Sequence, residues 1–130
     1  MGAGGKDTSQ SAMGKQHPWK PLTDEVVKEG LEFVLARSNH PVLVCCTSGI
    51  HETGAFVGCL RRLLAWNFNS IVVEYRCFAG SKARSLIQQF IELFDTDLVT
   101  VSRTRHRKQD LPCWYLEYMR SAEEEKEESK

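Results

Sequence analysis

The chain has 130 residues, a length that suits one domain built around a single core. It carries 17 basic and 17 acidic residues, so no net charge attracts it to nucleic acid or to an anionic membrane. Residues 1–13 are rich in glycine and serine, and residues 121–130 are almost entirely charged. We therefore expect one folded domain over residues 14–120 between two disordered, solvated tails.

The sequence shows neither an apolar stretch of about 18 residues, which a membrane span requires, nor a secretory leader. A soluble cytoplasmic protein is therefore expected. The five cysteines are an odd number, and we expect all of them to be free thiols. The spacing of the cysteines around His51 fits no standard zinc pattern, so we expect no cofactor and regard metal binding as a minor alternative.

The first predicted elements lead to a loop that contains cysteine. Thr23 or Asp24 can cap a helix that runs to about Arg37 and ends before the proline of "SNHP". Residues 42–45 form a short, continuously apolar run, which is typical of a buried strand. After the loop, apolar residues at helical spacing predict a second helix over residues 54–66.

The second half of the chain predicts more helix and little strand. A third helix is predicted over residues 71–78 and a fourth over residues 81–95. Residues 98–102 are predicted to form an edge strand, and this segment and residues 113–118 are candidate neighbours for the strand at residues 42–45. The basic run at residues 103–108 is interpreted as a solvated loop, because no aromatic residues lie between its charges to stack on bases.

The loop at residues 46–53 has the layout of a phosphate-binding site. It follows an apolar run, begins with Cys46 and leads through small residues into a helix. In such a loop the backbone N–H groups converge on an anion, and the positive end of the helix dipole favours both the anion and a thiolate. The layout therefore predicts a cysteine nucleophile that faces a phosphate group.

Several further segments follow this loop in a recognisable order. The sequence reads "NHPVLVCCTSGIHETGAFVGCLRRL", then "EY", "FAGSKAR" and "FIELFD", and it is preceded by "GKQHPW" at residues 14–19. From residue 14 to residue 95 it resembles the plant-and-fungal atypical dual-specificity phosphatases, a branch of the cysteine-dependent protein tyrosine phosphatase superfamily. The resemblance implies an α/β fold, here the C-terminal portion of a tyrosine-phosphatase-like fold. That portion should be helix-rich with a reduced sheet, because a further N-terminal portion supplies most strands in the family.

In that family a cysteine attacks the phosphate of phosphotyrosyl proteins or inositol pyrophosphates, and water then hydrolyses the cysteinyl-phosphate. The resemblance makes Cys46 the nucleophile and places Lys82 and Arg84 at the border of the pocket. The general acid could be Asp24 or His17, although Asp24 is better explained as a helix cap. The phosphate loop would consist of Thr47, Ser48, Gly49, Ile50, His51, Glu52 and Thr53, the last of which can hydrogen-bond the sulfur.

Two departures from the family pattern change the charge of the loop. Glu52 occupies the arginine position, and Cys45 replaces a histidine. At an effective dielectric constant of about 20, two unit charges about 4 Å apart interact by roughly 4 kcal/mol, so an anion in place of a cation opposes the binding of a phosphate dianion. A carboxylate near Cys46 is also expected to raise the pKa of the thiol. Both effects predict weak catalysis.

Three functions therefore remain open. The first is a tyrosine- or dual-specificity-phosphatase-like domain that is impaired or inactive and acts as a pseudophosphatase or binding module. The second is an active phosphatase on phosphotyrosyl proteins or inositol pyrophosphates, in which Lys82, Arg84 or His51 replaces the arginine. The third is a thiol redox sensor at Cys45 and Cys46.

One expected partner is a phosphorylated protein or an inositol phosphate ligand. Another is a second copy of the chain or a related phosphatase-family subunit, because a lone strand needs a neighbour. Nucleic acid and membrane are not expected partners.

Overall fold

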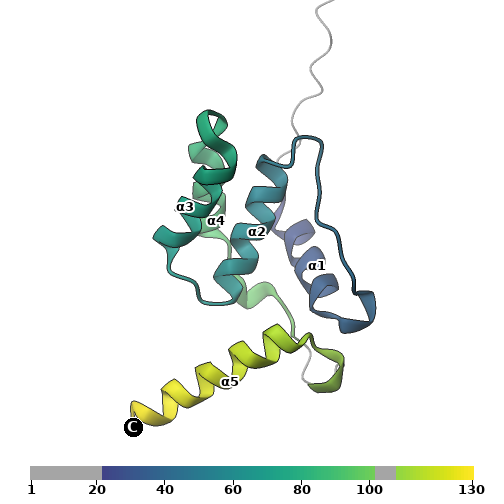
Figure 1. Ribbon diagram of the computed structural model, residues 1–130, viewed down its shortest axis with the longest axis vertical. Coiled ribbons are helices and arrows are strands. Elements are labelled where there is room, and N and C mark those ends of the chain that lie inside the picture. The colour runs from purple at the N-terminus through teal and green to yellow at the C-terminus, as the bar shows by residue number, and fades with distance from the viewer. Residues whose placement is uncertain (1–21, 102–107) are drawn as a thin grey trace, which may run out of the picture.

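Figure 1 shows the computed structural model of the chain, which describes residues 22–101 and 108–130. Within these ranges the chain forms five α-helices and four short 3-10 helices. The α-helices are α1 (Asp24–Leu35), α2 (His51–Leu63), α3 (Phe68–Ala79), α4 (Ser85–Leu93) and α5 (Cys113–Glu128). The 3-10 helices are η1 (Arg37–Asn39), η2 (Gly80–Lys82), η3 (Thr96–Leu98) and η4 (Lys108–Asp110).

Helix α1 begins at the expected cap. The side-chain oxygen of Thr23 accepts a hydrogen bond from the N–H of Val26, and two acidic residues in the first turn complement the positive end of the helix dipole. The helix ends at Leu35, and Nε2 of His40 then donates to the carbonyl of Val34 at 2.7 Å. This contact folds the turn back onto the helix and directs the following extended segment toward the loop.

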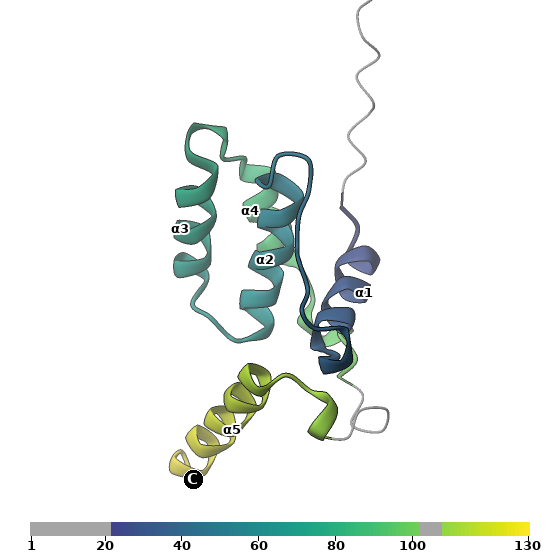
Figure 2. The ribbon, with the colours of Figure 1, turned by 45° about the vertical axis from the view of Figure 1, so that its right-hand side comes forward.

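Helix α2 lies at the centre of the fold, with α3 and α4 on one side and α1 on the other (Figures 1 and 2). Its first residue is His51, so the helix begins one turn earlier than predicted. The buried side chains that join these four helices include Val27, Leu31, Leu35, Ala55, Cys59, Ile71, Tyr75, Ile87, Ile91 and Phe94. Full burial of a large apolar side chain stabilises a fold by about 1.5–3 kcal/mol, so this cluster is the main source of stability.

Two glycines of α2 allow its neighbours to approach closely. A Cβ atom at Gly58 would lie 2.4 Å from Cδ1 and 2.7 Å from Cγ1 of Ile91 on α4. A Cβ atom at Gly54 would lie 2.7 Å from Cδ2 of the Tyr75 ring on α3. Because Ile91 and Tyr75 are both buried, neither side chain has room to move away. The two glycines therefore set the distance of α2 from α3 and α4.

Two consecutive arginines of α2 make polar contacts with these same helices. Arg61 donates two hydrogen bonds to the carboxylate of Glu74 on α3, at 3.1 and 3.0 Å. Arg62 donates to the backbone carbonyl of Ile91 at 2.9 Å and to that of Glu92. The last carbonyls of a helix have no partner within the helix, so Arg62 caps the C-terminal end of α4.

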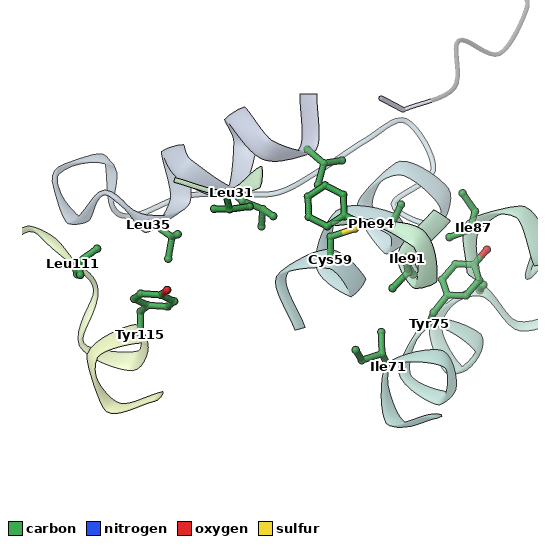
Figure 3. Close-up of a cluster of buried hydrophobic side chains, with 14 residues drawn as sticks. Leu31, Leu35, Cys59, Ile71, Tyr75, Ile87, Ile91, Phe94, Leu111 and Tyr115 are labelled. Carbon is green, nitrogen blue, oxygen red and sulfur yellow. The ribbon is translucent and has the colours of Figure 1, made fainter. Parts of the chain in front are cut away.

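Helix α5 attaches to the rest of the fold through its beginning. Leu111 and Tyr115 are buried, and Figure 3 shows them near Leu35 at one end of the hydrophobic cluster. The side chains of residues 123–130 are exposed. Residues 121–130 were expected to be a disordered tail, yet the helix continues to Glu128. Glutamate, lysine and alanine are strong helix formers, so this backbone is helical while its charged side chains stay in water.

The strands predicted from the sequence do not form in the described residues. Residues 42–45 are extended but unpaired, and Leu43 is 85% exposed. In the region predicted as an edge strand, Leu98 ends η3 and residues 99–101 are not a strand, while residues 113–118 belong to α5. A strand needs a second strand to pair its backbone groups, whereas a helix pairs them internally. The helix-rich part of the predicted fold is confirmed, and no sheet forms within residues 22–101 and 108–130. Ser102 and the basic residues 103–107 lie outside the described residues.

The close approach at Gly58 generates a first prediction. Gly58→Ala should lower the free energy of unfolding by about 1–3 kcal/mol, because the added methyl group overlaps Ile91 in a packed core. Urea denaturation followed by circular dichroism measures this loss. Ile91→Val removes the nearest atom, so the double variant should lose less stability than the sum of the two single variants. Strict additivity would contradict the proposed contact.

Candidate functional site

The predicted loop surrounds the thiol of Cys46 at the N-terminal end of α2. The extended residues 42–46 bring the chain to this end, and residues 47–50 form bends before the helix. Gly49 has a φ of 69°, in the left-handed region that favours glycine. This turn directs the N–H of Gly49 to the sulfur of Cys46 at 3.2 Å. The loop is therefore folded around the cysteine.

Two further hydroxyl groups organise the loop. Oγ1 of Thr53 donates to the Cys46 sulfur at 3.0 Å, as the resemblance implied. Oγ of Ser48 accepts a hydrogen bond from the N–H of Ile50 at 3.3 Å, which braces the turn. Thr47 lies between these contacts, and its side chain is exposed. The donors thus converge on one sulfur atom.

The net effect of these contacts is to lower the pKa of the Cys46 thiol below its ordinary value. Burial alone raises this pKa, but the hydroxyl of Thr53 and the backbone N–H groups of Thr53, Gly49 and Ser48 outweigh burial. Hydrogen bonds to the thiolate stabilise the charged form, which is the reactive nucleophile. The expectation that Glu52 leaves Cys46 with a raised thiol pKa is therefore wrong. The nearby donors determine the direction of the shift.

His51 connects the loop to more distant parts of the chain. Its Nδ1 lies 3.3 Å from the hydroxyl of Tyr75 on α3, and the same hydroxyl accepts a hydrogen bond from the N–H of Arg84 at 3.0 Å. Burial lowers the pKa of His51 most; the positive charges of Arg84 and Lys82 lower it further, and Glu52 opposes them. The net shift is downward, so His51 is neutral over most of the physiological range.

The two predicted border cations lie on the chain segment between α3 and α4. Lys82 ends η2, and Arg84 is the N-cap residue of α4. Both are exposed, and both act electrostatically on His51. The fold therefore brings this segment near the beginning of α2. Tyr75, which joins the two, was not assigned a role from the sequence, because its contacts depend on the packing of α3.

Glu52 is the second residue of α2 and is half-buried. A carboxylate in the first helical turn is stabilised by the positive end of the helix dipole. The same positive end would otherwise attract a phosphate group. Glu52 therefore adds negative charge to the end of α2 that would otherwise favour a bound anion.

A groove of about 350 Å³ begins beside the loop and runs between α2 and α3. Its residues at the loop end are Gly49, Ile50 and Thr53. Further along it is lined mainly by apolar side chains, among them Val57, Ile71 and Phe78. The groove offers contacts for an apolar group rather than for a second phosphate.

The remaining candidate residues lie apart from this arrangement or outside the described chain. Burial is the main reason that the pKa of Cys59 reaches about 12. Asp24, in the first turn of α1, raises the same pKa further through its charge. His17 lies outside the described residues. All five cysteines are unpaired, as expected.

Residues 22–101 and 108–130 contain neither a metal-binding cluster nor a helix suited to crossing a membrane. No group of three or more His, Cys, Asp or Glu side chains there could hold a metal ion. None of the helices in these ranges combines the length and the apolar composition that crossing a membrane requires.

A cysteine thiol stabilised by backbone N–H groups at the beginning of a helix is the reactive arrangement of the cysteine-dependent phosphatases. Residues 5–113 match the model of the "Tyrosine phosphatase family". The chain therefore belongs to the tyrosine phosphatase family, which confirms the resemblance seen in the sequence at the level of this family.

Two tyrosine-protein phosphatases are among the relatives that the chain matches. "Probable tyrosine-protein phosphatase DG1060" of Dictyostelium discoideum is 54% identical over 85 residues, which is 65% of this chain and 51% of that protein. "Putative tyrosine-protein phosphatase OCA1" of Saccharomyces cerevisiae is 41% identical over 101 residues, 77% of this chain and 40% of that protein. The chain thus spans about half the length, or less, of the curated relatives it matches.

Solved structures support the fold. The core catalytic domain of PP-IP phosphatase SIW14 from S. cerevisiae, in complex with citrate, aligns with a TM-score of 0.57 and 44% identity over 59% of this chain and 47% of that one. A structure of the Siw14 catalytic core aligns with a TM-score of 0.60 and 41% identity, over 66% of this chain and 51% of that one. The helix-rich fold is therefore part of a tyrosine-phosphatase-like fold.

The contacts of Cys46 generate a second prediction. Thr53→Val removes the hydroxyl donor at 3.0 Å, so the pKa of Cys46 should rise and its alkylation by iodoacetamide should shift to higher pH. Mass spectrometry of peptides labelled over a pH series measures this shift. Thr47→Val is the matched control, because it makes the same change at an exposed position of the same loop. An unchanged pH profile for Thr53→Val would contradict the role of the hydroxyl.

Proposed function

We propose that the domain binds a phosphate group at the Cys46 loop but hydrolyses it poorly, and that it acts as a pseudophosphatase or binding module. The observation that carries this proposal is Glu52 in the first turn of α2, next to a loop that is otherwise formed around a stabilised thiol. In the resembling family an arginine at this position binds two phosphate oxygens and stabilises the charge of the transition state.

The charge of Glu52 has two consequences for catalysis. Its carboxylate repels a phosphate dianion, by roughly 4 kcal/mol for unit charges about 4 Å apart at an effective dielectric constant of about 20. It also leaves the phosphoryl oxygens without the bidentate donor that the reaction uses. The lowered pKa of Cys46 compensates for neither, because it supplies a nucleophile without stabilising the charge that develops on the phosphate.

The ligand that we propose is a phosphotyrosyl protein or an inositol pyrophosphate. The relatives are described as tyrosine-protein phosphatases, and the similar SIW14 domain is described as a PP-IP phosphatase. That domain was solved with citrate, a small anion with several negative charges. A ligand with clustered negative charge would also be attracted by Lys82 and Arg84.

The second candidate function is an active phosphatase in which another cation replaces the arginine. Two observations favour it: the pKa of Cys46 is lowered, and the charges of Arg84 and Lys82 act on His51 at the first residue of α2. The two candidates differ in one measurable property, the turnover of the unmodified protein. A redox sensor at Cys45 and Cys46 remains a third hypothesis.

A charge reversal at Glu52 provides the third prediction. Glu52→Arg should increase Cys46-dependent hydrolysis of p-nitrophenyl phosphate on the order of 100-fold, the effect typical of one charge-stabilising group. Glu52→Gln should improve phosphate binding more than turnover, since it removes repulsion without adding a donor. Steady-state release of nitrophenol and calorimetric titration with phosphate measure the two effects.

The control is Cys46→Ser in the Glu52→Arg background, which should abolish the gain. Rapid Cys46-dependent turnover by the unmodified protein would reject the pseudophosphatase and support the active enzyme. No gain in Glu52→Arg would show that Glu52 is not the main cause of low activity.

We also propose that the apolar segment at residues 42–44, in which Leu43 and Val44 are exposed, pairs with a second copy of the chain or with a related phosphatase subunit. We place the protein in the cytoplasm, where thiols stay reduced. For the second copy, the fourth prediction is a concentration-dependent dimer in light scattering, which Leu43→Lys disrupts. Leu86→Lys is the control, because Leu86 is also exposed but lies on α4. A monomer at every concentration would rule out self-association.

A further inference from the structure

The hydroxyl of Tyr75 occupies a junction between three parts of the fold. Tyr75 belongs to α3 and is only 4% exposed. Its oxygen accepts the N–H of Arg84, which is the N-cap residue of α4, and lies 3.3 Å from Nδ1 of His51, the first residue of α2. One buried atom therefore joins the helix that follows the Cys46 loop to the segment that carries Lys82 and Arg84.

The contact with Arg84 has a defined direction, and the direction of the contact with His51 depends on the tautomer of its ring. The backbone N–H of Arg84 can only donate, so the phenol oxygen accepts it. The single proton of the hydroxyl remains available for donation to Nδ1 of His51, which lies at the long distance of 3.3 Å. An accepting Nδ1 belongs to a neutral imidazole with its proton on Nε2. The lowered pKa of His51 agrees with this state.

The ring of Tyr75 is held in place by its packing. A side chain at Gly54 would collide with the ring, since a Cβ atom there would lie 2.7 Å from Cδ2 and 2.9 Å from Cε2. Figure 3 shows the ring within the hydrophobic cluster, near Ile87 and Ile91, with its hydroxyl at the edge. Because the ring is buried among fixed neighbours, its oxygen keeps one position relative to α2 and α4.

We propose that Tyr75 is a positioning residue for the anion site: its hydroxyl holds His51 and the backbone of Arg84 together, so that the cations of the segment 80–84 stay beside the Cys46 loop. Tyr75 itself does not contact the anion. This inference rests on the proposed phosphate binding. It identifies the Tyr75 hydroxyl as the group that holds positive charge beside a loop that carries Glu52.

A role in packing alone would not require the hydroxyl group. Phenylalanine fills nearly the same volume as tyrosine and would preserve the close packing against Gly54. Positioning depends on the oxygen atom. Tyr75→Phe therefore separates the two roles, because it removes one atom and leaves the ring in the core.

In Tyr75→Phe, the pKa of His51 should rise toward its ordinary value, because the hydroxyl that stabilises the neutral ring is lost and Arg84 is held less closely. The backbone amide of Arg84 should exchange with solvent faster. Proton NMR of the histidine rings over a pH series, with His51 assigned by its loss in His51→Gln, and amide exchange measure these effects without any ligand. In the Glu52→Gln background, the affinity for inorganic phosphate should fall about five-fold, as for the loss of one hydrogen bond.

Tyr115→Phe is the matched control. Tyr115 is also buried, at 7% exposed, but it lies with Leu111 and Leu35 at the other end of the cluster (Figure 3). This control should leave His51, Arg84 and phosphate affinity unchanged, and thermal melting should show that both variants are folded.

The proposal is overturned if Tyr75→Phe matches Tyr115→Phe in the pKa of His51 and in the exchange of Arg84. It is also overturned if the pKa of His51 and the amide exchange of Arg84 change but the phosphate affinity does not, since Tyr75 would then not act on the anion site. Failure of every variant to bind phosphate would contradict the proposed function, while the ligand-free measurements would still decide whether Tyr75 holds His51 and Arg84.

Discussion

The close packing of α2 against α3 and α4 determines the position of every other part of this fold. At Gly54 and Gly58 the surfaces meet so closely that any side chain would overlap Tyr75 or Ile91. The rings and branched side chains of the neighbouring helices occupy the space instead, and Cys59 is completely buried beside them. Because the loop is attached directly to the beginning of α2, this packing also determines where Cys46 lies.

The site separates two properties that a phosphatase normally combines. The first is a stabilised thiolate, which depends on hydrogen bonds from Gly49 and Thr53 to one sulfur atom. The second is positive charge for the phosphoryl oxygens, which in the resembling family comes from the residue at position 52. The hydrogen bonds to the sulfur are present with Glu52 at that position. The carboxylate opposes the second property, because its negative charge repels the ligand.

The positive charge that remains near the loop comes from a different segment. Lys82 and Arg84 lie between α3 and α4, and both act on the first residue of α2. Their position depends on a connection through Tyr75, so the electrostatics of the loop are coupled to the packing of α3. The extended residues 42–45, in contrast, have an exposed apolar side chain in Leu43 and no strand beside them within the described chain.

The sequence by itself determined the local features. The threonine cap of α1, the apolar spacing of α2 to α4 and the layout of the Cys46 loop follow from interactions between residues a few positions apart, and so they could be predicted. Three results needed the tertiary structure. Residues 42–45 have the composition of a buried strand, but strand formation depends on a neighbour that local sequence does not specify. The pKa of Cys46 is lowered because several donors converge on its sulfur, an effect that depends on distances. The role of Tyr75 depends on Arg84 and His51, which are brought to one oxygen atom only when three helices pack together.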